Sequence, residues 1–166
     1  MAQVNFNGKT VSDGELKEVL EAICRVFKSN VNVTSGDRSA PREDGAKDKS
    51  LHLQKRAVDF HVEGVDDGTA YEKIKLYFNH IFSNSHGYEF IWHGPYTETG
   101  GQHLHIGRYG SAYLGYVKCI KEGITPQGKK VYQKEITLNI VFGRQSYIKP
   151  PVYEGGNYMD QFINRK

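Results

Sequence analysis

The strongest constraint on the fold is a short run of alternating residues near the middle of the chain. From Arg56 to Val62, apolar side chains occupy every second position, which is typical of a β-strand with one buried face. Asp59 falls on the other face, among β-branched and aromatic neighbours. Burying a carboxylate there is costly unless a positive group meets it. A cation or a cationic side chain is therefore expected beside Asp59.

Histidines before and after this strand are the obvious partners for the aspartate. His52 precedes Asp59 by a short segment, and His103 and His105 point the same way from a second strand-like segment. Imidazoles and a carboxylate are the ligand types of a catalytic zinc ion, whose fourth position is left for water. The alternative is a set of unconnected structural histidines. The complete set of residues, in this order along the chain, favours the zinc interpretation.

The pattern Ser-x-His-x-x-x-x-Ala-x-Asp followed by His-x-His resembles the zinc D-Ala-D-Ala carboxypeptidase family, and also the hedgehog amino-terminal signalling domain, which shares its fold. The resemblance covers roughly residues 12–108. It implies that His52, Asp59 and His105 bind Zn²⁺. It also implies that Arg38, in a Ser-Gly-x-Arg turn, faces the substrate's terminal carboxylate. From spacing alone, Arg38 could equally be a solvated loop residue.

Two positions depart from the family's pattern. Lys55 stands where the family usually has glycine. Gln102 stands three residues before His105, where the peptidases usually have an acidic residue that transfers a proton. An amide cannot act as a general base, so any hydrolysis needs another group within reach of the attacking water.

Several residues could replace the missing acid. His103 would share a strand face with His105, and it matches a histidine near the metal in some relatives. Glu98 lies in the preceding Gly-rich loop, close to where hedgehog has a glutamate near its zinc. Glu89 and His93 are further candidates. We expect His103 and Glu98 to be the catalytic pair.

The composition describes one soluble-type domain of 166 residues, with 38% hydrophobic and 25% charged residues. A net charge of +3, with basic residues interspersed among acids, argues against nucleic-acid binding. No segment is apolar enough to span a membrane, and no signal peptide is evident. We therefore expect a monomer made in the cytoplasm, delivered to the cell wall by another route or associated with a phage.

Hydrophobic periodicity predicts an α+β fold, with a small antiparallel or mixed sheet and helices packed on one face, as in hedgehog and DD-peptidases. Helices are expected over residues 12–28 and 69–82, and strands over 31–34, 57–62, 88–93 and 103–106. Each helix is expected to begin with a capping box, Ser12 with Glu15 and Thr69 with Glu72.

The last third of the chain is expected to form a C-terminal β-hairpin. Residues 116–121 and 130–142 are strand-like, and residues 125–128 have turn chemistry. We expect residues 1–110 to be a zinc peptidase-like core, and residues 111–166 to be strands and a tail packed on the same domain. A wall-binding role for this tail is the alternative.

These features favour a zinc metallopeptidase that hydrolyses peptide bonds of bacterial peptidoglycan. The bond would be that of a D-Ala-D-Ala carboxypeptidase or of an endolysin-like L-Ala-D-Glu endopeptidase, with a peptidoglycan peptide as the substrate. The alternative is a hedgehog-like binding module whose zinc is not catalytic, which Gln102 and Lys55 favour. A third interpretation is an α+β domain without metal.

Overall fold

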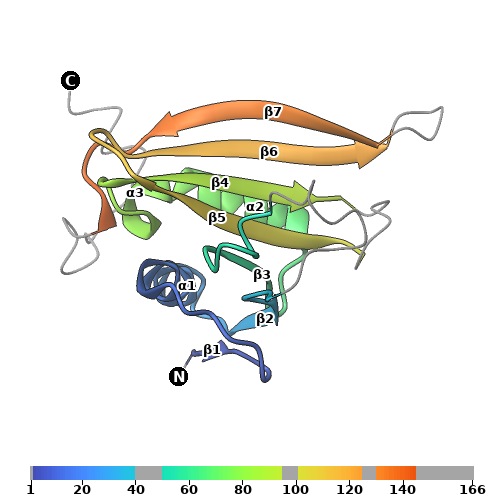
Figure 1. Ribbon diagram of the computed structural model, residues 1–166. Helices are drawn as coiled ribbons and strands as arrows, with labels where there is room; N and C mark the ends of the chain where they lie inside the picture. Colours follow the sequence, from blue (N-terminus) through green and yellow to red (C-terminus); the bar gives the residue numbers. More distant parts are fainter. Residues whose placement is uncertain (1, 40–49, 95–100, 125–129, 145–166) are drawn as a thin grey trace, which may run out of the picture.

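A computed structural model describes residues 2–39, 50–94, 101–124 and 130–144 of the chain. Within them, seven strands form one mixed sheet in the order β1-β2-β3-β5-β4-β6-β7 (Figure 1). The strands are β1 (Val4–Asn5), β2 (Val31–Ser35), β3 (Ala57–Val62), β4 (His86–His93), β5 (His103–Ser111), β6 (Tyr116–Ile124) and β7 (Lys130–Asn139). The helices are α1 (Gly14–Phe27), α2 (Asp67–Leu76) and α3 (Phe78–Ile81). The prediction of an α+β fold with a mixed sheet is confirmed.

The core lies between the helices and one face of the sheet. Val58, Phe60 and Val62 of β3 are fully buried, as the alternating pattern predicted. They belong to one apolar cluster with residues of α1, α2, β4 and β5. Since successive strand residues point to opposite faces, Asp59 and His61 lie on the face that the helices do not cover.

The two longer helices, α1 and α2, are capped at their amino ends by aspartates, so the predicted capping boxes are wrong. Asp13 caps α1 by accepting hydrogen bonds from the backbone amides of Glu15 and Leu16. Asp66 caps α2 by accepting from the amide of Thr69. An aspartate oxygen makes this contact as well as a serine or threonine oxygen does.

Glu15 does not cap the helix; it binds Arg144 and Tyr88. It binds Arg144 in a paired contact, with Arg144 nitrogens 2.7 and 2.9 Å from its two oxygens, and it accepts a 2.5 Å hydrogen bond from the Tyr88 hydroxyl. Arg144 is almost fully buried, so it requires such a partner. The contact ties the first helix to the chain that follows β7.

The hairpin of β6 and β7 extends the same sheet beyond β4. β6 pairs with β4 in parallel and with β7 in antiparallel, so the last two strands form one edge while β1 forms the other (Figure 1). The predicted turn at residues 125–128 and the tail after residue 144 lie outside the described residues. Among the helices described, none is both long and apolar enough to cross a membrane.

Candidate metal centre

Strand register places Asp59 beside His105. The two residues are direct partners in the antiparallel pair of β3 and β5. His105 Nδ1 lies 2.9 Å from Asp59 Oδ1, and the His105 side chain is buried. Both residues therefore face the same side of the sheet, opposite the helices.

A tight turn before β3 brings His52 to the same carboxylate oxygen. The Ser50 hydroxyl accepts a 3.1 Å hydrogen bond from the His52 amide, which explains the serine two residues before the histidine. His52 Nε2 then lies 3.1 Å from Asp59 Oδ1. Its other ring nitrogen, Nδ1, donates to the Gly36 carbonyl at 2.8 Å.

Gly36 has to be glycine for this arrangement to form. A Cβ at this position would lie 2.1 Å from the carbonyl oxygen of Thr10. The close approach of the two backbone segments sets the carbonyl that orients the His52 ring. The Ser-Gly-x-Arg turn thus has a structural role at the site.

Lys55 closes the His52 turn in the left-handed region, with a φ of 59°. A residue with a Cβ is strained there, which accounts for glycine being usual at this position in the family that the sequence resembles. Lysine in place of glycine therefore leaves the turn intact but lowers the free energy of unfolding.

We expect Lys55→Gly to raise the free energy of unfolding by about 0.5–1 kcal/mol, the strain relieved less the extra chain entropy of glycine. Urea unfolding of the metal-free protein measures this change. Lys55→Ala is the matched control, since alanine keeps the Cβ and should leave stability close to that of the wild type. A glycine variant no more stable than the alanine variant would contradict the assignment of strain.

The ring nitrogens that face Asp59 are arranged to bind a cation. Since a carbonyl oxygen only accepts, His52 Nδ1 must carry a hydrogen, and the neutral ring then presents the lone pair of Nε2 to Asp59 Oδ1. His105 likewise donates from Nε2 to Glu89, so its neutral form presents the lone pair of Nδ1. Facing lone pairs repel each other. Either protons on both rings or one metal ion must lie between them.

The distances suit hydrogen bonds and are also compatible with a metal site. Two ligands of a tetrahedral zinc ion are about 3.4 Å apart, as metal–ligand bonds of roughly 2.0–2.2 Å require. The separations of 3.1 and 2.9 Å from Asp59 Oδ1 to the two histidines are close to this value. One donor atom each from His52, Asp59 and His105 lies within 4.8 Å of the others. The three residues therefore fit zinc.

Glu89 on β4 is the partner of His105 that the sequence alone did not identify. Its Oε2 accepts a 2.6 Å hydrogen bond from His105 Nε2, and its Oε1 accepts from the Tyr109 hydroxyl at 3.0 Å. Gly107 leaves room for it, because a Cβ there would lie 3.0 Å from Glu89 Oε2. A carboxylate on the far nitrogen of a ligand histidine fixes the ring and increases its basicity.

We expect Glu89→Gln to weaken zinc binding about 10- to 100-fold, since the amide removes the negative charge that supports His105. Competition with a zinc-buffering chelator measures the affinity. Glu63→Gln, at an exposed glutamate after β3, is the control and should leave the affinity unchanged. Equal affinity in the Glu89→Gln variant would remove Glu89 from the metal centre.

Burial and hydrogen bonding oppose each other in this cluster. Burial alone would raise the pKa of Asp59 and Glu89, but hydrogen bonds from the histidines hold the pKa of both carboxyls below the ordinary values. Burial alone would lower the pKa of His105, but its bonds to the same carboxylates raise that pKa to about 9. These bonds favour the protonated form of His105 in the metal-free site, and a metal ion would bind there in place of that proton.

The structure places His103 at the site and directs Gln102 away from it. His103 Nε2 lies 3.6 Å from Asp59 Oδ2, and its Nδ1 donates to the Gly101 carbonyl at 2.9 Å. Gln102, just before β5, accepts a 3.0 Å hydrogen bond from the Trp92 indole. Glu98 lies outside the described residues.

Arg38 is joined to the ligand turn through its backbone. Its amide donates to the His52 carbonyl at 3.0 Å, and its side chain is half-buried. The preceding residue, Asp37, accepts from the Ser12 amide at 3.2 Å and fixes the turn against the start of α1. The backbone of Arg38 is therefore bonded directly to the backbone of His52, a candidate metal ligand.

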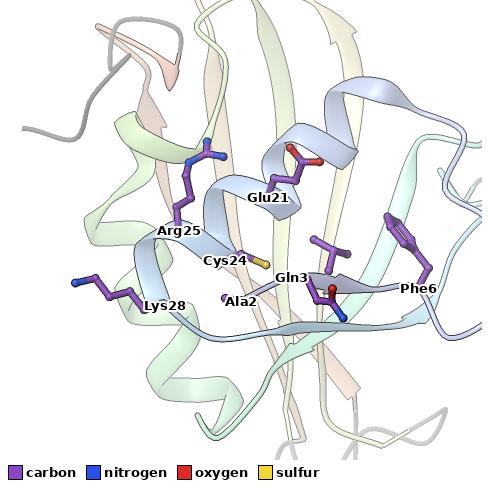
Figure 2. Close-up of a pocket in the computed structure, with 8 residues that line it drawn as sticks. Ala2, Gln3, Phe6, Glu21, Cys24, Arg25 and Lys28 are labelled. Carbon is purple, nitrogen blue, oxygen red and sulfur yellow. The ribbon is translucent and has the colours of Figure 1, made fainter.

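A separate pocket of about 940 Å³ lies between β1 and α1. Phe6, Cys24 and Lys28 are among its lining residues (Figure 2). None of the candidate ligands lines it, so this hollow has no part in the metal chemistry.

Comparison with protein families gives a match that covers part of this site. The model of the family described as Peptidase M15 matches residues 3–85, which is half of the chain. The match includes Arg38, His52 and Asp59 and ends before β4. Comparison with curated proteins and with solved structures gave no match.

Proposed function

Because the chain belongs to the Peptidase M15 family, we propose that it is a zinc peptidase that hydrolyses peptide bonds of bacterial peptidoglycan, as a carboxypeptidase or as an endolysin-like endopeptidase. His52, Asp59 and His105 would hold the zinc ion. The observation that best supports the proposal is the convergence of His52 Nε2 and His105 Nδ1 on one carboxylate oxygen of Asp59. A zinc ion would take the place of the ring protons at this oxygen, and three protein ligands would leave a fourth coordination position for water.

A zinc ion at this site would polarise the scissile carbonyl and acidify a water molecule towards a pKa of about 7. The protein's own residues set the conditions for that chemistry. Gly36 and Glu89 hold the two ligand rings through their outer nitrogens, so the site is organised before substrate arrives.

His103 would move the proton in this mechanism. Its Nδ1 hydrogen is held by the Gly101 carbonyl, so the neutral ring accepts a proton at Nε2, beside Asp59. The resulting imidazolium would face the reacting carbonyl and stabilise developing negative charge. His103 thereby replaces the acidic residue whose position Gln102 occupies.

Arg38 would bind the carboxylate of the wall peptide. A guanidinium group can grip a carboxylate with two parallel hydrogen bonds, and an ammonium group cannot. The backbone contact between Arg38 and His52 supports this role, because it keeps the arginine near the metal ligands.

We expect Arg38→Lys to lower kcat/KM about 10- to 100-fold, the scale of one or two lost charged hydrogen bonds. Zinc content and melting temperature should stay unchanged. Steady-state hydrolysis of a soluble wall peptide measures the effect, with Arg25→Lys on the exposed side of α1 as the control. Wild-type kinetics in Arg38→Lys would show that Arg38 does not bind the substrate carboxylate.

The function is tested by digesting purified peptidoglycan with the zinc-loaded protein and identifying the fragments by mass spectrometry. Release of D-alanine indicates a carboxypeptidase, and new amino termini within the stem peptide indicate an endopeptidase. A zinc-containing protein that cleaves no wall substrate would instead favour the hedgehog-like binding module.

A further inference from the structure

Three polar side chains form a row across β5, β4 and β6 next to the candidate ligands. His93 is the direct strand partner of His103 in the antiparallel pair, and of Glu122 in the parallel pair. All three therefore project from the same face of the sheet as Asp59 and His105. The row begins at the residue proposed to transfer the proton and ends inside the protein.

The inner end of the row is an ion pair that orients the His93 ring. The Glu122 side chain is 1% exposed, and its Oε2 accepts a 3.0 Å hydrogen bond from His93 Nδ1. A buried carboxylate is costly, and it fixes the hydrogen of His93 on Nδ1. The two strands stay close just beyond the pair, because the Gly94 amide donates to the Glu122 carbonyl and a Cβ at Gly94 would lie 2.7 Å from that oxygen.

The outer end of the row is a stack of two imidazoles. The rings of His93 and His103 are 4.3 Å apart between centroids, with an angle of 25° between their planes. The His93 ring therefore covers one face of His103, while the Gly101 carbonyl holds its Nδ1 edge. These two contacts leave Nε2 directed at Asp59.

We propose that His93 and Glu122 are positioning residues for His103: Glu122 fixes the His93 ring, and the face of that ring holds His103 Nε2 towards the metal centre. The catalytic consequence rests on the proposed function, whereas the orientation of the ring does not. A group misplaced by about 1 Å can lose roughly 100-fold in rate, so a loose His103 would slow turnover without disturbing the zinc ligands.

The test compares His93→Ala, which removes the stack, with His93→Phe, which keeps a ring face but not the bond to Glu122. His61→Ala is the matched control, since His61 on β3 is partly exposed and donates from Nδ1 to a different buried acid, Asp67, at 2.9 Å. Glu122→Ala removes the acceptor that fixes the His93 ring, and it tests the role of Glu122 separately.

Two readouts are needed. Long-range proton–nitrogen spectra of the zinc-loaded protein should show one His103 tautomer in the wild type, His93→Phe and His61→Ala, and a mixture in His93→Ala and Glu122→Ala. kcat should fall about 10- to 100-fold in His93→Ala, with KM and zinc content unchanged, and should be largely restored in His93→Phe.

An ordered His103 ring in His93→Ala, or equal losses of kcat in the alanine and phenylalanine variants, would overturn the proposal. A wild type that orders His103 as expected but hydrolyses nothing would refute the proposed function, and the spectra of His93→Ala would still decide the positioning role.

Discussion

Replacing His105 by alanine is expected to abolish stoichiometric zinc binding and to lower the melting temperature of zinc-treated protein. The variant loses a candidate ligand and leaves Asp59, a largely buried carboxylate, with one of its two closest imidazoles. The loss of affinity should exceed the roughly 10- to 100-fold expected for an outer partner such as Glu89. Because metal binding adds to folding free energy, the melting temperature should no longer respond to zinc.

Zinc per chain after dialysis, together with thermal melts with and without zinc, measures this effect. His61→Ala is the control, because His61 lies two residues from Asp59 on the same strand face but is bonded to Asp67. Full zinc occupancy in the His105→Ala variant would refute the ligand set.

Replacing His103 by alanine is expected to lower the rate of wall-peptide hydrolysis roughly 100-fold or more, the usual scale for a general acid–base or oxyanion group. The variant should retain zinc, because His103 Nε2 lies 3.6 Å from Asp59 Oδ2 and the candidate ligand group does not require it. The rate of peptide release at saturating zinc measures the change.

Glu98→Gln is the variant to compare with His103→Ala, because Glu98 is the other candidate for proton transfer. A loss similar to that of His103→Ala would give the carboxylate a share in proton transfer, and a wild-type rate would leave that role to His103. Wild-type rates in both variants would contradict the proposed site.

The sequence predicted most of the sheet that contains the site, because the relevant signals were local. Period-two alternation predicted β3 with its observed bounds and placed Asp59 away from the core. The same alternation predicted that His103 and His105 share a face. The position of His52 came from the order of the motif, and a turn whose hydrogen bonds lie between near neighbours holds it in place.

The contacts between distant segments could not be predicted in this way. Glu89 was a candidate for proton transfer, but its bond to His105 depends on the register of β4 against β5, which no local pattern encodes. Glu15 had the sequence signature of a capping box, yet it binds Arg144, which is 129 positions away. In each case tertiary pairing outweighed the local preference.

The central claim is that one zinc ion lies between His52, Asp59 and His105. The most direct measurement is a crystal structure of zinc-soaked protein with anomalous diffraction data collected above and below the zinc absorption edge. We predict one strong anomalous peak, present only above the edge, between His52 Nε2, Asp59 Oδ1 and His105 Nδ1. A map with no peak there, or with zinc bound only by other residues, would contradict the account.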